Sequence, residues 1–154
     1  MASSLTRMLL EAHLAEGTGR ARGVATGAEA ALRIDQVLMD AEAATLVFLS
    51  FEATGRSRAQ IEAALACAEI SPPAAAFEAG DALRYAQSAA RRYGVHFSRA
   101  GNGRAHQVHA ARFAAPGRTL LACAAGAATA GALGSLVLDA SAIELAAAHA
   151  GAPH

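Results

Sequence analysis

Short apolar runs alternate with helical segments along this chain, and this alternation constrains the fold more than any other feature. Helical spacing or end signals mark residues 43–53, 77–93 and 129–150. Apolar runs of strand length lie between these segments, at residues 34–38, 95–98 and 119–123. Strands that alternate with helices pair in parallel, because each helix returns the chain to the edge where the previous strand began. The sequence therefore predicts an α/β fold of three layers (α/β/α) with a mainly parallel sheet.

The clearest helix is predicted over residues 77–93, with Gly94 as its C-cap. One face carries Ala79, Leu83, Ala86, Ala90 and Tyr93. The helix over 43–53 offers Leu46, Leu49 and Phe51 for packing. A short helix is expected over 106–113, after the G-N-G turn at 101–103. Thr129 is expected to cap the last helix, which reaches about residue 150.

Residues 57–70 carry conflicting signals. Ser57 and Gln60 match a capping box, which favours a helix. Apolar and small residues at alternate positions indicate a strand instead; they are Ile61, Ala63, Leu65 and Cys67. Either element ends at Pro72 and Pro73, because proline cannot donate a backbone hydrogen bond.

The chain has 154 residues, enough for one domain with a sizeable core. We expect a single domain over 1–154, in which residues 1–29 form an N-terminal helix and loop. Ser3 or Ser4 caps that helix, and three glycines break the chain after it: Gly17, Gly19 and Gly23. The N-terminus lacks the apolar core of a signal peptide, which predicts a cytoplasmic protein.

The charge and hydropathy of the sequence indicate which kinds of partner to expect. The net charge is +0, and the sequence shows no arginine run and no basic face, so we expect no nucleic-acid partner. Residues 119–138 are uncharged and long enough to cross a membrane. They are mostly alanine and glycine, and they divide into a strand and the start of a helix, so we expect no membrane partner. Cys67 and Cys123 lack metal-ligand spacing and are expected to be reduced, buried and small.

Several blocks of the sequence resemble the first domain of the aconitase family, the iron–sulfur hydro-lyases that include aconitate hydratase and isopropylmalate isomerase. The bacterial aconitate hydratase branch is the closest. The blocks occur in the family's order and cover roughly residues 30–152; they lie at 33–40, 46–53, 77–87, 93–109, 116–121 and 129–134. The resemblance implies an aconitase-domain-like fold and places a strand within 57–70.

The resemblance also implies a site, and the chain departs from the family there. The family's Q-D-A-T segment corresponds to residues 40–43 (D-A-E-A), and its Asp-His pair corresponds to Glu69 and Ile70. The family's S-D-S-H segment corresponds to residues 123–126 (C-A-A-G). The family's histidine before glutamine survives as His106-Gln107. The cysteines that hold the family's cluster lie in a later domain, which this sequence does not contain, and Cys67 and Cys123 do not match them.

These departures predict a truncated domain that has lost the aconitase reaction. A tricarboxylate needs many polar donors, which the changed loops no longer supply, and Asp40, Glu42 and Glu69 would repel it. Two separated cysteines cannot hold an iron–sulfur cluster in the usual way. We therefore expect no cofactor and no metal. The predicted function is a cofactor-independent lyase, isomerase or cyclase that acts on a less anionic small molecule, in a specialised biosynthetic pathway.

Two alternatives stay open: a non-catalytic subunit of an aconitase-like protein, and a small-ligand binding module. Whichever of the three functions holds, we expect a homo-oligomer or a partner aconitase-like subunit, because the first domain of the family packs against others. The candidate catalytic residues are His106, Glu69 and Asp40, and the candidate substrate-binding residues are Gln107, Glu42, Arg99, Cys123 and Thr129. The pocket is expected where the loops at 39–43, 69–72 and 123–128 meet His106.

Each candidate also has a structural interpretation. His106 is either a general acid/base or a histidine hydrogen-bonded beside the G-N-G turn. Cys123 is a nucleophile at a strand end or a small filler. The carboxylates form a site or are solvated loop charges, and Arg99 binds an anion or covers the G-N-G loop. His109 pairs with His106 on a metal, or supports the structure.

Overall fold

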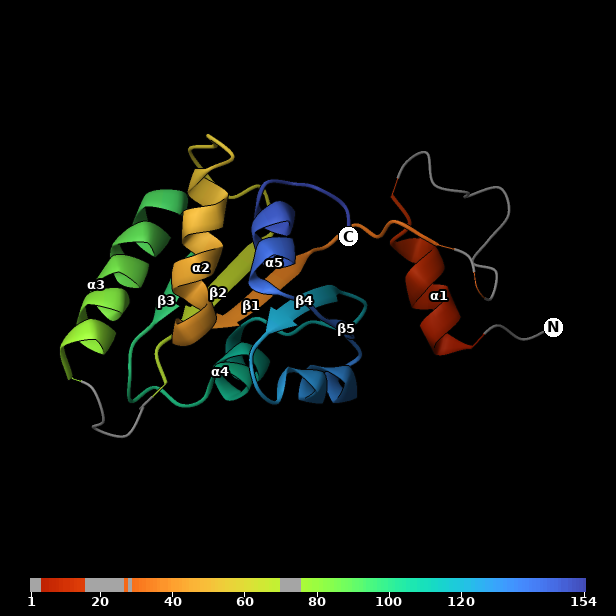
Figure 1. The fold of residues 1–154 in the computed structure, drawn as a ribbon. Coiled ribbons are helices and arrows are strands. Elements are labelled where there is room, and N and C mark those ends of the chain that lie inside the picture. Colours follow the sequence, from red (N-terminus) through yellow and green to blue (C-terminus); the bar gives the residue numbers. More distant parts are fainter. Residues whose placement is uncertain (1–3, 16–26, 28, 70–75) are drawn as a thin grey trace.

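The computed structural model describes residues 4–15, 27, 29–69 and 76–154. In this part of the chain, five parallel strands form one sheet in the order β3-β2-β1-β4-β5 (Figure 1). The strands are β1 (Gln36–Asp40), β2 (Ala63–Cys67), β3 (His96–Ser98), β4 (Thr119–Cys123) and β5 (Leu136–Asp139). The predicted parallel α/β/α fold is confirmed.

Helices cover both faces of the sheet. The helices are α1 (Leu5–Ala12), α2 (Ala41–Glu52), α3 (Ala76–Tyr93), α4 (Ala105–Arg112) and α5 (Ala142–His149), with a 3-10 helix η1 (Ala127–Leu133). On one face lie α2, α3 and α5, whereas α4 and η1 lie on the other (Figure 1). The strand within 57–70 is confirmed, and the Ser57/Gln60 capping box begins no helix.

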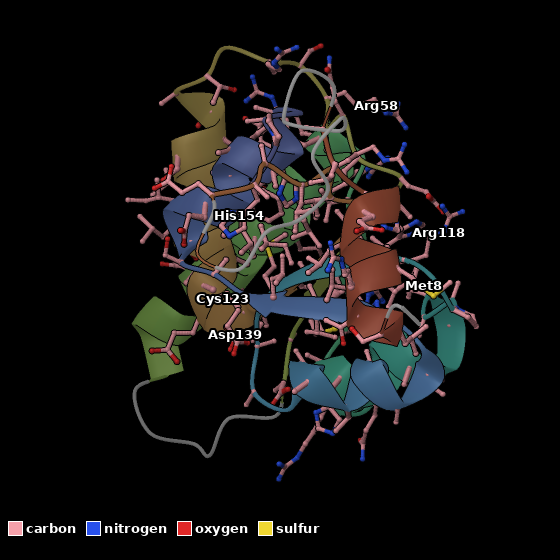
Figure 2. All side chains as sticks on the ribbon, turned by 90° about the vertical axis from the view of Figure 1, so that its right-hand side faces the viewer. Met8, Arg58, Arg118, Cys123, Asp139 and His154 are labelled. Atoms are coloured by element: carbon pink, nitrogen blue, oxygen red, sulfur yellow. The ribbon has the colours of Figure 1, made fainter. Side chains whose placement is uncertain are left out.

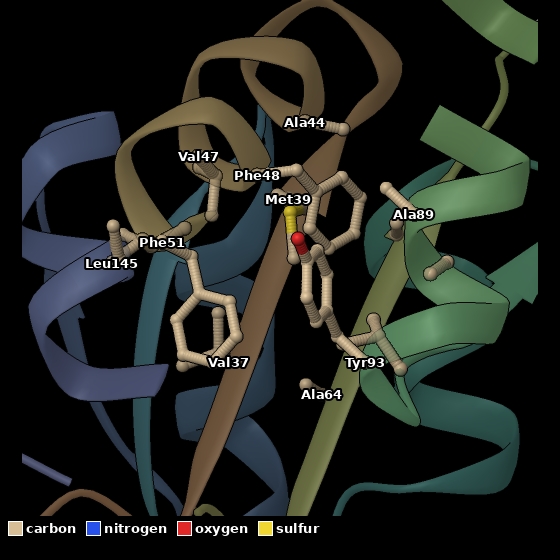
Figure 3. Packing of buried hydrophobic residues seen from close by; sticks show 14 of the residues in the cluster. Val37, Met39, Ala44, Val47, Phe48, Phe51, Ala64, Ala89, Tyr93 and Leu145 are labelled. Atoms are coloured by element: carbon tan, nitrogen blue, oxygen red, sulfur yellow. The ribbon is translucent and has the colours of Figure 1, made fainter. Parts of the chain in front are cut away.

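The larger apolar cluster lies between the sheet and α2, α3 and α5 (Figure 3). Phe48 and Phe51 of α2 pack on Tyr93 of α3, with ring centroids 6.1 and 5.0 Å apart. Val37 and Met39 of β1 face this cluster, and Leu38 between them faces the smaller cluster under α4 and η1. Both faces of the central strand β1 are buried, which explains why apolar residues follow one another in its sequence without alternating with polar ones.

The outer surface of α2 differs from the prediction. Val47, Phe48 and Phe51 are buried, but Leu46 and Leu49 are 52% and 51% exposed. The prediction that these two leucines pack in the core is therefore wrong. The helix begins at Ala41, where the Asp40 side chain accepts a hydrogen bond from the Ala43 amide at 2.9 Å.

The predicted helix over residues 129–150 is also wrong. Gly134 has a φ of 82°, a left-handed conformation that ends η1, and the run Leu136–Asp139 then pairs with β4. A new helix, α5, begins after Ser141, whose hydroxyl accepts from the Glu144 amide while Glu144 accepts from the Ser141 amide. Thr129 lies inside η1 and caps no helix; its hydroxyl donates to the Gly126 carbonyl at 2.8 Å.

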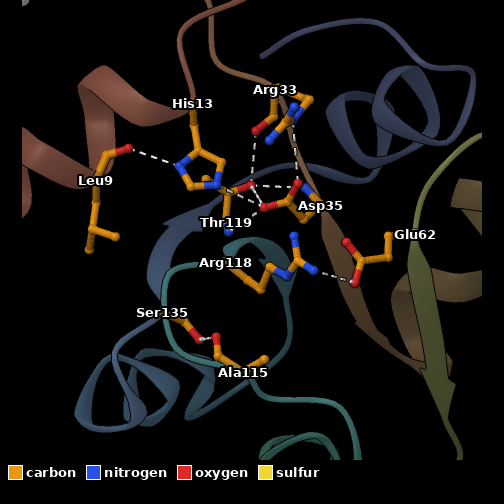
Figure 4. Close-up of polar contacts among 9 residues, drawn as sticks. All are labelled: Leu9, His13, Arg33, Asp35, Glu62, Ala115, Arg118, Thr119 and Ser135. Carbon is orange, nitrogen blue, oxygen red and sulfur yellow. Dashed lines mark hydrogen bonds and ion pairs between the residues drawn. The ribbon is translucent and has the colours of Figure 1, made fainter.

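The N-terminal helix α1 is capped by Ser4, as predicted, and none of its residues is buried. The chain after it is held by a buried polar cluster at the amino end of the sheet (Figure 4). There His13 Nε2 lies 3.0 Å from the Asp35 carboxylate, which also accepts from the Thr119 amide at 3.1 Å. The predicted break at Gly17, Gly19 and Gly23, and the predicted stop at Pro72 and Pro73, lie outside the described residues. No helix in the described segments is long and apolar enough to cross a membrane.

Candidate functional site

The candidate site lies at the edge of the sheet where the carboxyl ends of the strands meet, called here the carboxyl edge. The chain passes from β1 outward to β2 and β3, then returns to place β4 on the other side of β1. The carboxyl ends of β1 and β4 are thus the point where the strand order reverses, and ligands of parallel α/β sheets bind at such a point. Asp40 and Cys123 end these two strands, and Glu69 follows the end of β2.

His106 is the second residue of α4, and its ring is half-buried. Nδ1 lies 3.1 Å from the carbonyl oxygen of Ala125, in the loop after β4. A carbonyl only accepts, so this contact places the proton on Nδ1 and leaves Nε2 as an acceptor. The structure therefore brings His106 to the loop at 123–128, as the sequence predicts, in a tautomer that suits a general base.

Gly126 makes this contact sterically feasible. Its φ is 76°, and a Cβ atom there would lie 2.7 Å from His106 Nδ1. A side chain would therefore be strained in the backbone and would collide with the imidazole ring. The loop and the histidine can approach each other only because this residue is glycine.

The predicted carboxylates hold the starts of helices. Besides Asp40 at α2, the Glu69 carboxylate accepts from the Ala105 amide, the first residue of α4, at 2.8 Å. The Gln107 side chain accepts from the Arg104 amide at 3.2 Å at the same end of α4. Glu69 and Gln107 thus fix the turn that carries His106, so the contacts that they make are structural.

Negatively charged carboxylates surround the two thiols at this edge, those of Cys67 and Cys123. Burial raises the pKa of the Cys123 thiol, and Asp40, Asp139 and Glu42 raise it further. Burial raises the pKa of Cys67 to about 11, with smaller contributions from Glu69 and Asp40 against a hydrogen bond from Ser98. A thiol with a raised pKa is a weak nucleophile at neutral pH, which favours the packing interpretation of Cys123. The sequence analysis does not predict Asp139 at this edge, because it expects the residues of β5 to form part of a helix.

The structure does not gather all the candidates. Cys123 packs against the cluster under α2, α3 and α5, whereas His106 stands on α4 at the other face. Arg99, Glu42 and Thr129 are exposed. Two hollows, of about 320 and 420 Å³, lie at the opposite, amino edge of the sheet. The expected pocket at the carboxyl edge therefore stays a proposal, and part of it, at 70–72, lies outside the described residues.

His109 has a structural role, since its ring is buried and its Nε2 lies 2.9 Å from the Gln36 side-chain oxygen. Burial lowers its pKa. Within the described segments no three histidine, cysteine or carboxylate side chains gather as a metal site. Cys67 and Cys123 lie on opposite sides of β1 and face opposite sides of the sheet, so the structure does not pair them either.

The fold places this chain among parallel α/β domains, whose ligands commonly bind at the carboxyl ends of the strands. Comparison with known proteins indicates which family of such domains the chain resembles. No known family profile matches the chain. A protein named "Putative aconitate hydratase, mitochondrial" from Aspergillus fumigatus is 29% identical over 153 residues, which cover 89% of this chain and 19% of that protein. A protein of the same name from Emericella nidulans is 27% identical over 137 residues, 83% of this chain and 17% of that protein.

The chain thus spans about a fifth of the length of the curated relatives it matches. This similarity agrees with the resemblance carried by the sequence blocks and supports a relationship to the aconitase family. The relatives' names place those proteins in mitochondria, so the cytoplasmic location stays a prediction.

Proposed function

We propose that this chain is an aconitase-like domain that has been repurposed as a small-molecule enzyme. In this proposal His106 moves a proton on a substrate that carries fewer carboxylates than citrate, in a lyase, isomerase or cyclase reaction without a cofactor. The observation that carries the proposal is the contact between His106 Nδ1 and the Ala125 carbonyl. It leaves Nε2 with a lone pair at the edge where ligands of such sheets bind.

The charges at the carboxyl edge support the substrate class. Asp40, Glu42 and Asp139 act together on the Cys123 thiol, which indicates a negative potential there. A negative potential disfavours a polyanion and favours a neutral or cationic molecule. Asp40 and Glu69 each use one carboxylate oxygen to cap a helix, and the other oxygen is the one proposed to orient the substrate or share the proton transfer.

Proton exchange into candidate substrates tests this proposal. The purified chain is incubated in heavy water with citrate, isopropylmalate and their mono-acid and amide analogues, and deuterium incorporation is followed by NMR. We expect exchange into an analogue with fewer carboxylates, and a loss of about a hundred- to ten-thousand-fold in His106→Ala. His96→Ala is the matched control, because His96 is an exposed histidine at the other end of the sheet.

Exchange that is undiminished in His106→Ala would contradict the enzyme proposal, as would its absence for every analogue. Turnover of citrate or isopropylmalate by the purified chain, or bound iron, would contradict the proposed loss of aconitase chemistry. If either exchange result contradicted the enzyme proposal, the alternative of a non-catalytic subunit would replace it. The exposed Leu46, Leu49 and Ile143 on the outer surface of α2 and α5 favour that alternative, since they offer an apolar surface to a partner subunit or a second copy.

A further inference from the structure

The loop between α2 and β2 forms an open surface hollow of about 420 Å³ at the amino edge of the sheet. It is lined by Gly55, Arg56, Ser57, Arg58, Ala59 and Gln60. Every polar side chain in this lining carries a hydrogen-bond donor, and no carboxylate lines the hollow among the described residues. The volume lies in the range of small-molecule sites, about 300 to 1,000 Å³.

Arg58 is held in place by the end of α3. Gly94 has a φ of 77°, and a Cβ atom there would lie 2.8 Å from Arg58 Nε and 3.1 Å from Cζ. The guanidinium therefore lies directly on the glycine backbone, where any other residue would displace it. Two backbone bonds fix the end of the loop: the Ala59 amide donates to the Tyr93 carbonyl at 3.0 Å, and the Gln60 amide donates to the His149 carbonyl at 2.8 Å.

The carboxylates nearest in the chain are already paired. Glu52 binds Arg92 at 3.2 Å, and Glu62 binds Arg118 at 3.2 Å. Within the described residues, Arg56 and Arg58 form no ion pair. Figure 2 shows Arg58 and Arg118 on the side of the molecule away from Cys123 and Asp139. Arg56 and Arg58 thus both line the hollow, and among the described residues neither is neutralised by a carboxylate.

We propose that this hollow binds the phosphate group of a small molecule. A guanidinium presents a planar fork of donors that matches the oxygens of a phosphate, and such charge-assisted bonds are stronger than neutral ones. The Ser57 hydroxyl and the Gln60 amide add neutral donors to the same lining. The sequence alone does not indicate this site, because Arg56 and Arg58 belong to no run of basic residues and to no known motif.

Phosphate binding is measured by calorimetry and by NMR shifts of the backbone amides of residues 55–60, with inorganic phosphate and phenyl phosphate as probes at constant ionic strength. We expect both probes to bind. Arg58→Ala should weaken binding about tenfold or more, the loss expected for a charge-assisted hydrogen bond. Arg58→Lys should recover only part of it, because lysine keeps the charge but loses the fork.

Arg112→Ala is the matched control, because it removes an equal charge from the end of α4 on the other face of the sheet and should change binding less than about twofold. His106→Ala should leave phosphate binding unchanged, which separates this site from the proposed enzymatic one. The proposal is overturned if the amides of 55–60 do not shift with phosphate, if Arg112→Ala weakens binding as much as Arg58→Ala, or if acetate binds as tightly as phosphate.

Discussion

His106 and Gly126 depend on each other at the carboxyl edge. The histidine could be singled out from the sequence because it survives beside altered loops. The importance of Gly126 could not, since one glycine among 14 carries no signal of its own. Only the folded chain shows that the glycine faces the imidazole ring.

Replacing Gly126 by alanine tests this dependence. The new Cβ would collide with His106 Nδ1, and the left-handed backbone would itself cost about 1–2 kcal/mol in the free energy of unfolding. We expect a larger loss for Gly126→Ala than for Gly101→Ala, together with changed NMR shifts of the His106 ring. Gly101 is the matched control, because its φ is 96° and no atom lies within 4 Å of its would-be Cβ. Equal losses and an unmoved ring would refute the proposed contact.

At the scale of elements, the region after β4 shows how glycine and a cap divide a stretch that looks helical. Alanine-rich sequence has high helix propensity, which led to one predicted helix over 129–150. Gly134 and the Leu136–Asp139 run introduce a strand instead, because β4 offers an open edge that pairs with it. The tertiary pairing outweighs the local propensity.

The hydroxyls of Ser141 and Thr129 distinguish the observed strand and helix from a single helix over 129–150. Ser141→Ala should lower the free energy of unfolding by about 1 kcal/mol, because it removes the N-cap of α5. Thr129→Ala should cost less than about 0.5 kcal/mol, because Thr129 is exposed within η1 and caps no helix. Urea unfolding of both variants measures the difference. If Thr129→Ala were the more costly change, the single-helix prediction would be restored.

At the scale of the whole molecule, burial of neutral histidines makes stability depend on pH. His149 is fully buried beside Phe51 and donates from Nδ1 to the Leu145 carbonyl at 2.7 Å. Burial lowers its pKa, and burial lowers that of His109 as well. The folded state therefore resists protonation at these two rings, whereas the unfolded chain takes up protons below a pH of about 6.5.

Stability should consequently be highest above that pH. Because the unfolded state binds more protons at lower pH, the free energy of unfolding should fall as the pH decreases below about 6.5. It should stay level above that pH until the range where the thiols of the unfolded chain ionise, at about 8.5. Urea unfolding between mildly alkaline and mildly acidic pH measures this slope. Replacing His149 by glutamine should flatten the slope, although it lowers stability at every pH by disturbing the core. A slope unchanged in His149→Gln would show that this ring does not contribute.

The sequence by itself determined the layered α/β class, most of the strands, the long helix α3 and the histidine at the carboxyl edge. Each of these features depends on local residue spacing or on a motif, and both are present in the sequence before any long-range contact forms. The tertiary structure alone decided that 136–139 is a strand, that Leu46 and Leu49 face outward, and that Asp40 and Glu69 cap helices. It also brought Arg58 onto Gly94. Those features depend on which segments become neighbours, and long-range packing, not local propensity, sets those neighbours.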